Sequence, residues 1–325
     1  DEALKCKEQP HVQGCLVYTV SPYHTNETFV ELARKLEAMG CHSICIKDMS
    51  GLLKPYVAED LVLKLKAAVK VPIDLHTHYT SGFGSMTYLK AIEAGVDIID
   101  TALAPFSNDT SQPCTETMIE TLVGTPYDTG LDRHKLTPVS KYFLQVKQDL
   151  IKEFNLKGYF DVNPNVLDFQ IPGGMLSNLT NQLKEQGMED KYQDLLDEMP
   201  RVRADLGYPP LVTPSSQIVG TMATFNVIMG ERYKMVPREF KDLARGKFGH
   251  TPKPIEKEFL AKIGIKDSEI VTDCAIEDAK ENTVAQFREE LAGKGYAGAS
   301  EEDVLSYALF PQVAEEFFRT KGRMK

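Results

Sequence analysis

The chain has 325 residues, of which 42% are apolar and 26% charged, an ordinary composition for a globular protein of one large domain or about two domains. Its 37 basic and 47 acidic residues give a net charge of −10. That charge argues against nucleic acid and against anionic lipid as main partners, because both are bound by basic surfaces. No apolar run approaches the ~18 residues that a membrane-spanning helix needs.

The cysteines and the first residues bear on the compartment. Six cysteines are too few for a disulfide scaffold in a chain of this length, and none of them forms a CxxC pair. Cys15 and Cys45 fall in apolar runs, which predicts buried free thiols. The first ten residues lack the apolar stretch of a signal peptide. We therefore expect a protein of the reducing cytoplasm.

Short apolar runs alternate with helical patterns in the first third of the chain. The patterns predict strands at 14–20, 42–46, 71–75 and 96–101, and helices at 26–39, 57–69, 85–94 and 115–122. The strands are nearly continuous apolar runs, which is typical of a parallel sheet covered on both faces. Such a βα series builds either a doubly wound sheet or a (β/α)8 barrel. Because only four units are visible, the barrel interpretation implies four further units before them.

The pattern changes after about residue 130. Helices are predicted at 141–154, 177–186, 192–206 and 216–229, with turns rich in proline and glycine between them. The segment 250–285 is charged and weakly patterned, so we expect it to be exposed. The sequence therefore predicts two domains, the C-terminal half of a barrel over 1–130 and a mainly helical region over 131–325.

His76 and His78 give the strongest chemical signal. They follow the third predicted strand, and residues two apart on a strand point to the same side. At the carboxyl end of a barrel strand, that side is the mouth where active sites lie. Two neutral imidazoles there form half of a metal site, although two unrelated polar histidines at a strand end would show the same pattern.

Lys47 follows the second predicted strand directly. An ammonium group next to a buried strand is costly, so the side chain needs a special explanation. One is that it reaches the mouth and pairs with Asp48. The other is that its amine captures CO2 as a carbamate, which would turn a cation into an oxygen ligand beside His76.

A third signal is the segment 211–216, with the sequence LVTPSS. Pro214 favours an extended conformation at Thr213, just before a predicted helix that Ser215 or Ser216 is placed to cap. Free amides at such a helix start suit an anion such as a carboxylate, but capping alone also explains the pattern.

Several weaker candidates remain. Asp97 and Asp100 lie in the fourth predicted strand, where Asp100 is either a mouth residue or merely a packed polar group. The segment 23–25 follows the first strand and is placed to line the mouth. The turn 171–174 contains two glycines, which permit a close approach of the backbone.

Six ordered motifs resemble a known family, the biotin-dependent carboxyltransferases that act on pyruvate or oxaloacetate. This family includes the carboxyltransferase part of pyruvate carboxylase, whether a domain or a separate chain, the α subunit of oxaloacetate decarboxylase and the pyruvate-specific subunit of transcarboxylase. The motifs are KDMSGLLKP (47–55), LHTHYTSG (75–82), EAGVDIIDTA (93–102), QIPGGMLSNL (170–179), LVTPSSQIVG (211–220) and EEDVLSYALFPQVA (301–314).

The resemblance implies a TIM-type (β/α)8 barrel followed by a helical funnel. By motif, Lys47 would be a carbamylated metal ligand, His76 and His78 the histidine ligands, and Thr213 the group that relays a proton between pyruvate and biotin. The metal, zinc by preference over manganese or cobalt, would stabilise the enolate of pyruvate. We expect Ser216, Gln217 and Gly174 to contact substrate or biotin.

The departures from the family pattern are informative. The family's fourth protein ligand, an aspartate in an RDAHQS-type motif on the first barrel strand, is absent, as is a substrate-binding arginine of the same half. Either the sequence is truncated or another chain completes the barrel. Gln217 and Met175 favour the decarboxylase or transcarboxylase branch. Without a biotin-accepting Met-Lys-Met motif, a separate biotin carboxyl carrier protein or domain is expected.

Two other functions remain open at this point. One is a related metal-dependent lyase or acyl-CoA condensing enzyme, which would share the histidine pair but would not need the Lys47 carbamate. The other is a half-barrel that is catalytically incomplete. The family further implies a homodimer and, within a membrane decarboxylase complex, a subunit peripheral to the membrane.

Overall fold

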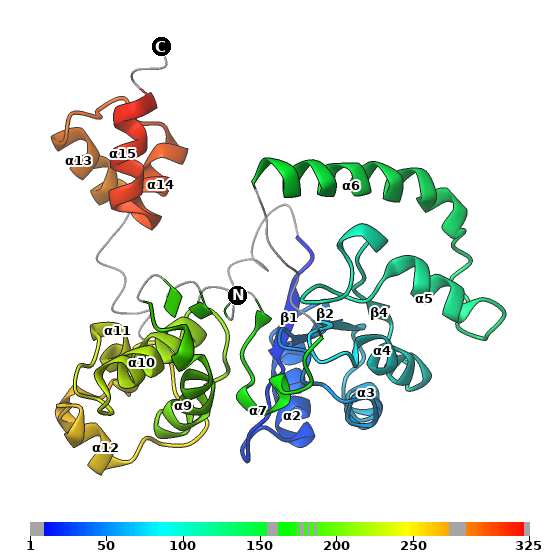
Figure 1. The fold of residues 1–325 in the computed structure, drawn as a ribbon, viewed down its shortest axis with the longest axis horizontal. Coiled ribbons are helices and arrows are strands. Elements are labelled where there is room, and N and C mark those ends of the chain that lie inside the picture. Colours follow the sequence, from blue (N-terminus) through cyan, green and yellow to red (C-terminus); the bar gives the residue numbers. More distant parts are fainter. Residues whose placement is uncertain are drawn as a thin grey trace. The chain divides into compact units, whose positions relative to one another are not determined.

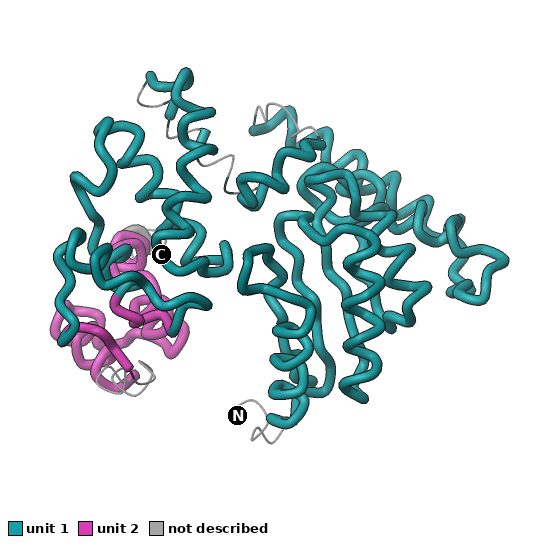
Figure 2. The backbone as a smooth tube through the Cα atoms, turned by 90° about the horizontal axis from the view of Figure 1, so that it is seen from below, with its two compact units in different colours: residues 1–244, 250–268 teal, residues 245–249, 269–325 magenta. Residues whose placement is uncertain are grey.

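The computed structural model describes residues 10–154, 162–173, 175, 179–180, 183–184, 187–272 and 284–321. Two compact units divide the chain (Figure 2). The first unit comprises residues 1–244 and 250–268, and the second comprises residues 245–249 and 269–325.

A four-stranded parallel sheet forms the core of the first unit. Its strands lie in the order β1-β2-β3-β4, and a helix connects each strand to the next. These elements are β1 Gln13–Val17, α2 Asn26–Ala38, β2 Ser43–Asp48, α3 Pro55–Ala68, β3 Ile73–Thr77, α4 Gly84–Glu93 and β4 Ile98–Ile99, with α5 Thr115–Leu122 after the last strand. The four predicted βα units, and with them the α/β class, are confirmed (Figure 1).

Alternation along the strands separates the two faces of this sheet. Ile44 and Ile46 of β2 are fully buried, as are Ile73 and Leu75 of β3. The residues between them point to the opposite face. Lys47 therefore shares a face with the next strand's His76, and the two are register partners.

Two of the strands extend further than the sequence predicts. β2 includes Lys47 and β3 includes His76, so both side chains are positioned by strand backbone rather than by a loop. Another prediction is wrong: Cys15 is exposed, because it lies on an edge strand. The four cysteines within the described residues are free thiols.

The rest of the first unit is mainly helical. Its elements are η1 Ala104–Phe106, α6 Arg133–Glu153, α7 Val166–Phe169, η2 Glu189–Lys191, α9 Tyr192–Asp205, α10 Ser215–Met229, α11 Arg238–Ala244 and α12 Lys257–Lys262, and the short η3 Asp267–Glu269 spans the boundary with the second unit. α6 begins well before the predicted residue 141, because the side chain of Asp132 caps it by accepting the His134 backbone N–H. The predicted helix 177–186 lies partly outside the described residues.

The expectation of an exposed stretch over 250–285 is wrong for its first part. Leu260, Ile263 and Ile265 are buried, and the Phe259 ring lies edge-on to Tyr233 with the centroids 4.8 Å apart. These few apolar residues are separated by charged residues in the sequence, so the segment showed no clear apolar pattern. Residues 273–283 lie outside the described part of the chain.

The described residues of the second unit form the helices α13 Val284–Gly293, α14 Glu301–Leu309 and α15 Pro311–Lys321. Its core contains Leu291, Val304, Tyr307, Ala314 and Phe318. Ser300 and Asp303 form a reciprocal capping box at the start of α14. Within the described residues, no helix is long and apolar enough to cross a membrane.

Candidate active site

The two predicted histidines converge at the carboxyl end of β3. The Nε2 atoms of His76 and His78 lie 3.2 Å apart, and the ring centroids lie 5.1 Å apart. The sequence prediction that both rings point to one side is therefore confirmed. Two nitrogen atoms this close together can contact the same bound atom or ion.

The other nitrogen of each ring is held by an acceptor. His76 Nδ1 lies 2.8 Å from the Oδ2 atom of Asp100, and His78 Nδ1 contacts the backbone oxygen of Thr110. These acceptors place a proton on Nδ1 of each ring, so Nε2 is the nitrogen of each ring that is left to bind a ligand. A carboxylate or carbonyl behind a histidine in this way is the usual support of a metal-binding imidazole. Asp100 is thus a mouth residue.

Burial lowers the pKa of His78. The charges of His76 and Lys47 act in the same direction, whereas the hydrogen bond to Thr110 acts against them. The ring is therefore kept neutral, which is the form that binds a metal.

Lys47 faces this pair from the neighbouring strand. It is half-buried, and within the described part of the chain its amine has neither a hydrogen-bond nor an ion-pair partner. The alternative that it pairs with Asp48 is wrong. The Asp48 carboxylate is fully buried and accepts hydrogen bonds from the backbone N–H groups of Leu52 and Leu53 and from the Thr77 hydroxyl.

The loop after β2 packs directly on the loop after β3. Gly51 has a φ of +67°, and a Cβ atom there would lie 2.5 Å from the backbone oxygen of His78. The Ser81 hydroxyl donates to the Gly51 backbone oxygen. Two of the sequence motifs therefore meet, and only glycine fits between them.

The glycine turn and the residues after it make two further close approaches. Gly173 lies against the Thr110 side chain, and Met175 lies against Gly220 of α10. Thr110 in turn holds His78. Contacts through Thr110 thus link the glycine turn to His78. Met175, two residues further along the chain, contacts α10, the helix that begins within the TPSS segment.

Thr213 is exposed and joined to Pro214 by a cis peptide bond, just before α10 begins at Ser215. The predicted capping is wrong, because no side chain caps this helix. The Ser215 hydroxyl instead donates to loop carbonyls, including that of Val212 at 2.7 Å, and closes the turn. Ser216 is buried and Gln217 is exposed. Gly174 lies outside the described residues.

The weaker candidates have structural partners. Asp97 accepts the Ile73 backbone N–H and pairs with Lys66, so it is not at the mouth. Thr25 caps α2, and Tyr23 packs on Tyr208. The pKa of His24 is lowered to about 4 by burial and by the charge of Arg203.

The polar groups at the mouth fit a divalent transition metal. Two imidazole Nε2 atoms converge, and neutral imidazole is a common ligand of zinc, manganese and cobalt sites. Among the described residues, however, no group of three or more His, Cys, Asp or Glu side chains is placed to hold a metal. Lys47 as its carbamate would supply the further oxygen donor that this set lacks.

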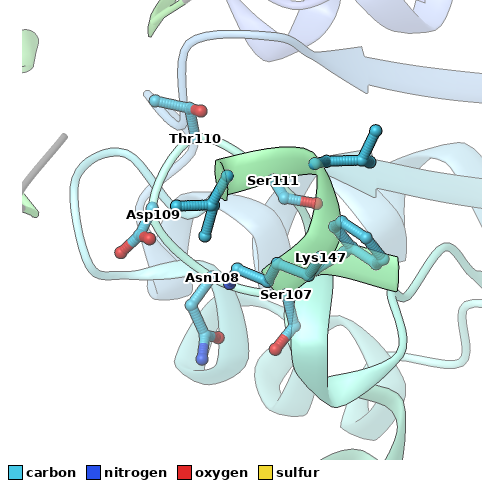
Figure 3. A pocket seen from close by; sticks show the side chains of 9 residues that line it. Ser107, Asn108, Asp109, Thr110, Ser111 and Lys147 are labelled. Carbon is cyan, nitrogen blue, oxygen red and sulfur yellow. The ribbon is translucent and has the colours of Figure 1, made fainter. Parts of the chain in front are cut away.

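Sequence reasoning missed two residues of the site, Thr110 and Gln112. The Gln112 Nε2 atom lies 3.4 Å from His76 Nε2 and 3.3 Å from His78 Nε2. Both residues belong to a loop before α5 whose other side, with Lys147 of α6, lines a pocket of about 220 Å³ (Figure 3). The polar run before Pro113 was the available signal.

Comparisons with known proteins show which proteins this chain is similar to. A conserved carboxylase domain matches residues 166–325, and an HMGL-like domain matches residues 18–142. A pyruvate carboxylase subunit of Methanocaldococcus jannaschii is 49% identical, with 97% of this chain and 54% of the relative covered. The methylmalonyl-CoA carboxyltransferase 5S subunit of Propionibacterium freudenreichii subsp. shermanii is 43% identical, with 97% of this chain and 62% of the relative covered.

A solved structure is similar over nearly the whole of this chain. The carboxyl transferase domain of Rhizobium etli pyruvate carboxylase with pyruvate and biocytin gives a TM-score of 0.88 at 30% identity, covering 99% of this chain and 56% of that one. The chain spans about half the length of the relatives it matches. Over nearly all of its own length, this chain is a relative of the biotin-dependent carboxyltransferases, and the resemblance seen in its sequence is confirmed.

Proposed function

We propose that the protein containing this chain is a biotin-dependent carboxyltransferase that moves CO2 between biotin and pyruvate or oxaloacetate. The observation that carries the proposal is the convergence of two imidazole Nε2 atoms, 3.2 Å apart, on rings whose Nδ1 atoms each contact an acceptor. The similarity to a carboxyl transferase domain solved with pyruvate and biocytin supports the substrate pair.

Lys47, His76 and His78 would hold the metal, with Lys47 carbamylated. Its half-buried amine faces His76 in register and has no partner within the described residues, which leaves it available to react with CO2. A bound zinc ion, or manganese or cobalt, would polarise the ketone oxygen of pyruvate and favour loss of a methyl proton. Asp100 and Thr110 hold the two rings in the orientation that this requires.

Thr213 would carry the proton. When biotin gives up its carboxyl group, its ureido nitrogen takes the proton that the Thr213 hydroxyl receives from the methyl carbon of pyruvate, and the reverse transfer accompanies decarboxylation. Its exposed position before α10 suits such a relay. Ser216, Gln217 and Gly174 complete the proposed surface for substrate or biotin.

The remaining parts of the proposal concern the whole protein. Residues 1–130 would supply the metal site and residues 131–325 the helical funnel. The biotin would arrive on a separate carrier protein or domain. We further propose a homodimer in the cytoplasm, which would be peripheral to the membrane if it serves a decarboxylase complex.

The test is made on the complete native protein that contains this chain. Its metal content, its intact mass and the transfer of labelled carboxyl from oxaloacetate to biotin are measured for the wild type, Lys47→Ala and Lys64→Ala. Lys64 is a matched control, because it lies outside the site and pairs with Glu27 and Asp60. We expect about one metal per chain and the mass of one CO2 on Lys47 in the wild type and the control, and loss of transfer in Lys47→Ala.

Other outcomes would identify the competing functions. Metal binding without carboxyl transfer, together with full lyase or condensing activity in Lys47→Ala, would favour the metal-dependent lyase or condensing enzyme; the HMGL-like match over residues 18–142 is the finding on its side. A wild-type protein with neither metal nor a modified lysine would show a catalytically incomplete half-barrel.

A further inference from the structure

The loop that supports the histidines is closed on itself. Its Asn108 backbone N–H donates to the Gln112 backbone oxygen at 2.8 Å, and its Ser111 N–H donates to the Asn108 oxygen at 2.7 Å. Asn108 and Asp109 adopt φ values of +64° and +51°, which asparagine and aspartate tolerate better than most residues. The Tyr79 backbone N–H ties the loop to the strand end by donating to the Ser111 oxygen. The loop is therefore a defined structure beside His78.

Two groups of this loop contact the histidines. The Thr110 oxygen accepts the Nδ1 proton of His78, and the Gln112 amide nitrogen lies 3.4 Å and 3.3 Å from the Nε2 atoms of His76 and His78. These two Nε2 atoms lie 3.2 Å from each other, so the three nitrogen atoms converge on one place. Gln112 therefore meets both imidazoles at the nitrogens whose lone pairs a shared ligand would take.

A metal ion would need the same two lone pairs. The amide N–H groups would then face a cation, which is unfavourable. The terminal torsion of glutamine has two nearly equivalent orientations, and half a turn about it exchanges the amide nitrogen for the oxygen. The Ser111 hydroxyl lies 3.2 Å from the Gln112 oxygen, and a hydroxyl both donates and accepts, so it bonds to either arm of the amide. The loop therefore supports both orientations without moving.

We propose that Gln112 is a positioning residue of the metal site: its amide lies against the Nε2 atoms of both imidazoles, and its oxygen turns toward a metal ion that they hold. This inference rests on the metal site of the proposed function. A neutral oxygen there stabilises the ion without adding negative charge, so the ion keeps its ability to polarise a carbonyl. A carboxylate at the same place would bind the ion more tightly and polarise the carbonyl less.

Two substitutions with opposite expected effects test this role. On the complete native protein, the dissociation constant of cobalt(II) is measured by competition with a chelator, and the visible spectrum of bound cobalt is recorded. Gln112→Ala should weaken binding about 10-fold, within the range for groups that support metal ligands. Gln112→Glu should tighten binding while lowering kcat. Both should change the cobalt spectrum.

Gln193→Ala is the matched control. Gln193 is a glutamine outside the site whose amide donates to Asp197 at 2.9 Å, so its loss should leave cobalt binding and the spectrum unchanged. Equal weakening by both Gln112 variants would reduce the residue to a structural role, and affinities and spectra like those of the wild type would also overturn the inference. If the wild type binds no cobalt, the metal site and this inference fail together. If it binds cobalt and the variants respond as expected but no carboxyl is transferred, only the proposed function fails.

Discussion

The first unit holds two clusters of polar side chains that differ in how completely their groups are paired. In the histidine cluster at the ends of β2 and β3, each ring has one nitrogen supported and one facing the other ring, and the Lys47 amine has no partner within the described residues. In the second cluster, between α9 and α10, the buried Glu198 carboxylate accepts from Asn226 at 2.8 Å and Arg232 at 2.6 Å, and pairs with Arg201 at 3.1 Å.

The difference separates stability from function. Arg232 also pairs with Asp205, which accepts a hydrogen bond from the Tyr233 hydroxyl, so the Glu198 cluster is a network of satisfied charges. Such a network holds helices together, because each of its charged groups has a partner of opposite charge. The histidine cluster keeps donor atoms available, which costs stability and leaves room for a ligand. Substitutions in the two clusters should therefore have opposite signatures.

The largest effect on folding is expected from Glu198→Gln. The change keeps the volume of the side chain but removes its charge from between two arginines, one of them half-buried. We expect the free energy of unfolding to fall by about 3 kcal/mol, the lower end for a broken buried ion pair. Metal affinity should not change. Urea denaturation and metal titration measure the two quantities.

Glu231→Gln is the control for that substitution. Glu231 is exposed and pairs with Lys234 at 3.7 Å, so the free energy of unfolding of this variant should differ from that of the wild type by less than about 0.5 kcal/mol. If the two variants were equally stable, the Glu198 cluster would not be the stabilising network that its geometry indicates.

Asp100→Asn should show the opposite signature. The carboxylate behind His76 sets the proton on Nδ1, and an amide in its place supports the ring less well. We expect zinc binding to weaken about 10- to 100-fold, which is the usual range for such supporting groups, with little change in unfolding.

Asp97→Asn separates this role from that of a nearby carboxylate. Asp97 lies three residues earlier but accepts a backbone N–H and pairs with Lys66. Its variant should lose about 1 kcal/mol of stability and keep its zinc affinity. Equal zinc affinities in the two variants would show that Asp100 does not support the metal site.

The sequence was sufficient for the parts of this site that periodicity controls. The alternation of apolar runs predicts four βα units, and the strand period places His76 and His78 on one side and near Lys47. All of these depend on local backbone geometry, which the residue pattern encodes. The same rule misplaced the ends of β2 and β3 by two residues, because polar residues at the mouth interrupt the apolar run while the strand continues.

The missed features depend on contacts between distant segments. Gln112 and Thr110 reach the histidines from more than 30 residues away through a loop with two left-handed residues. Asp48 follows Lys47 directly, but turns away because backbone N–H groups of the next loop satisfy its carboxylate. No periodicity encodes such loop conformations, and a charged neighbour in the sequence is a poor guide to a partner in space.

The last predicted effect is a dependence of stability on pH through His24, which lies just before α2 and close to Arg203 of α9. Burial and the charge of Arg203 on α9 lower the pKa of His24 to about 4, whereas the unfolded chain protonates near its ordinary value of 6.5. Stability from this group is therefore complete above pH 6.5 and is lost as the pH falls toward 4, because the unfolded state binds the proton first. Partial exposure limits the loss to about 1–2 kcal/mol.

His24→Asn tests this prediction, because the asparagine side chain can still bond to Ser21 but cannot titrate. The free energy of unfolding of the wild type should therefore fall relative to that of the variant as the pH falls from 7 to 4.5, and parallel pH profiles would show that burial and Arg203 do not lower the pKa of His24.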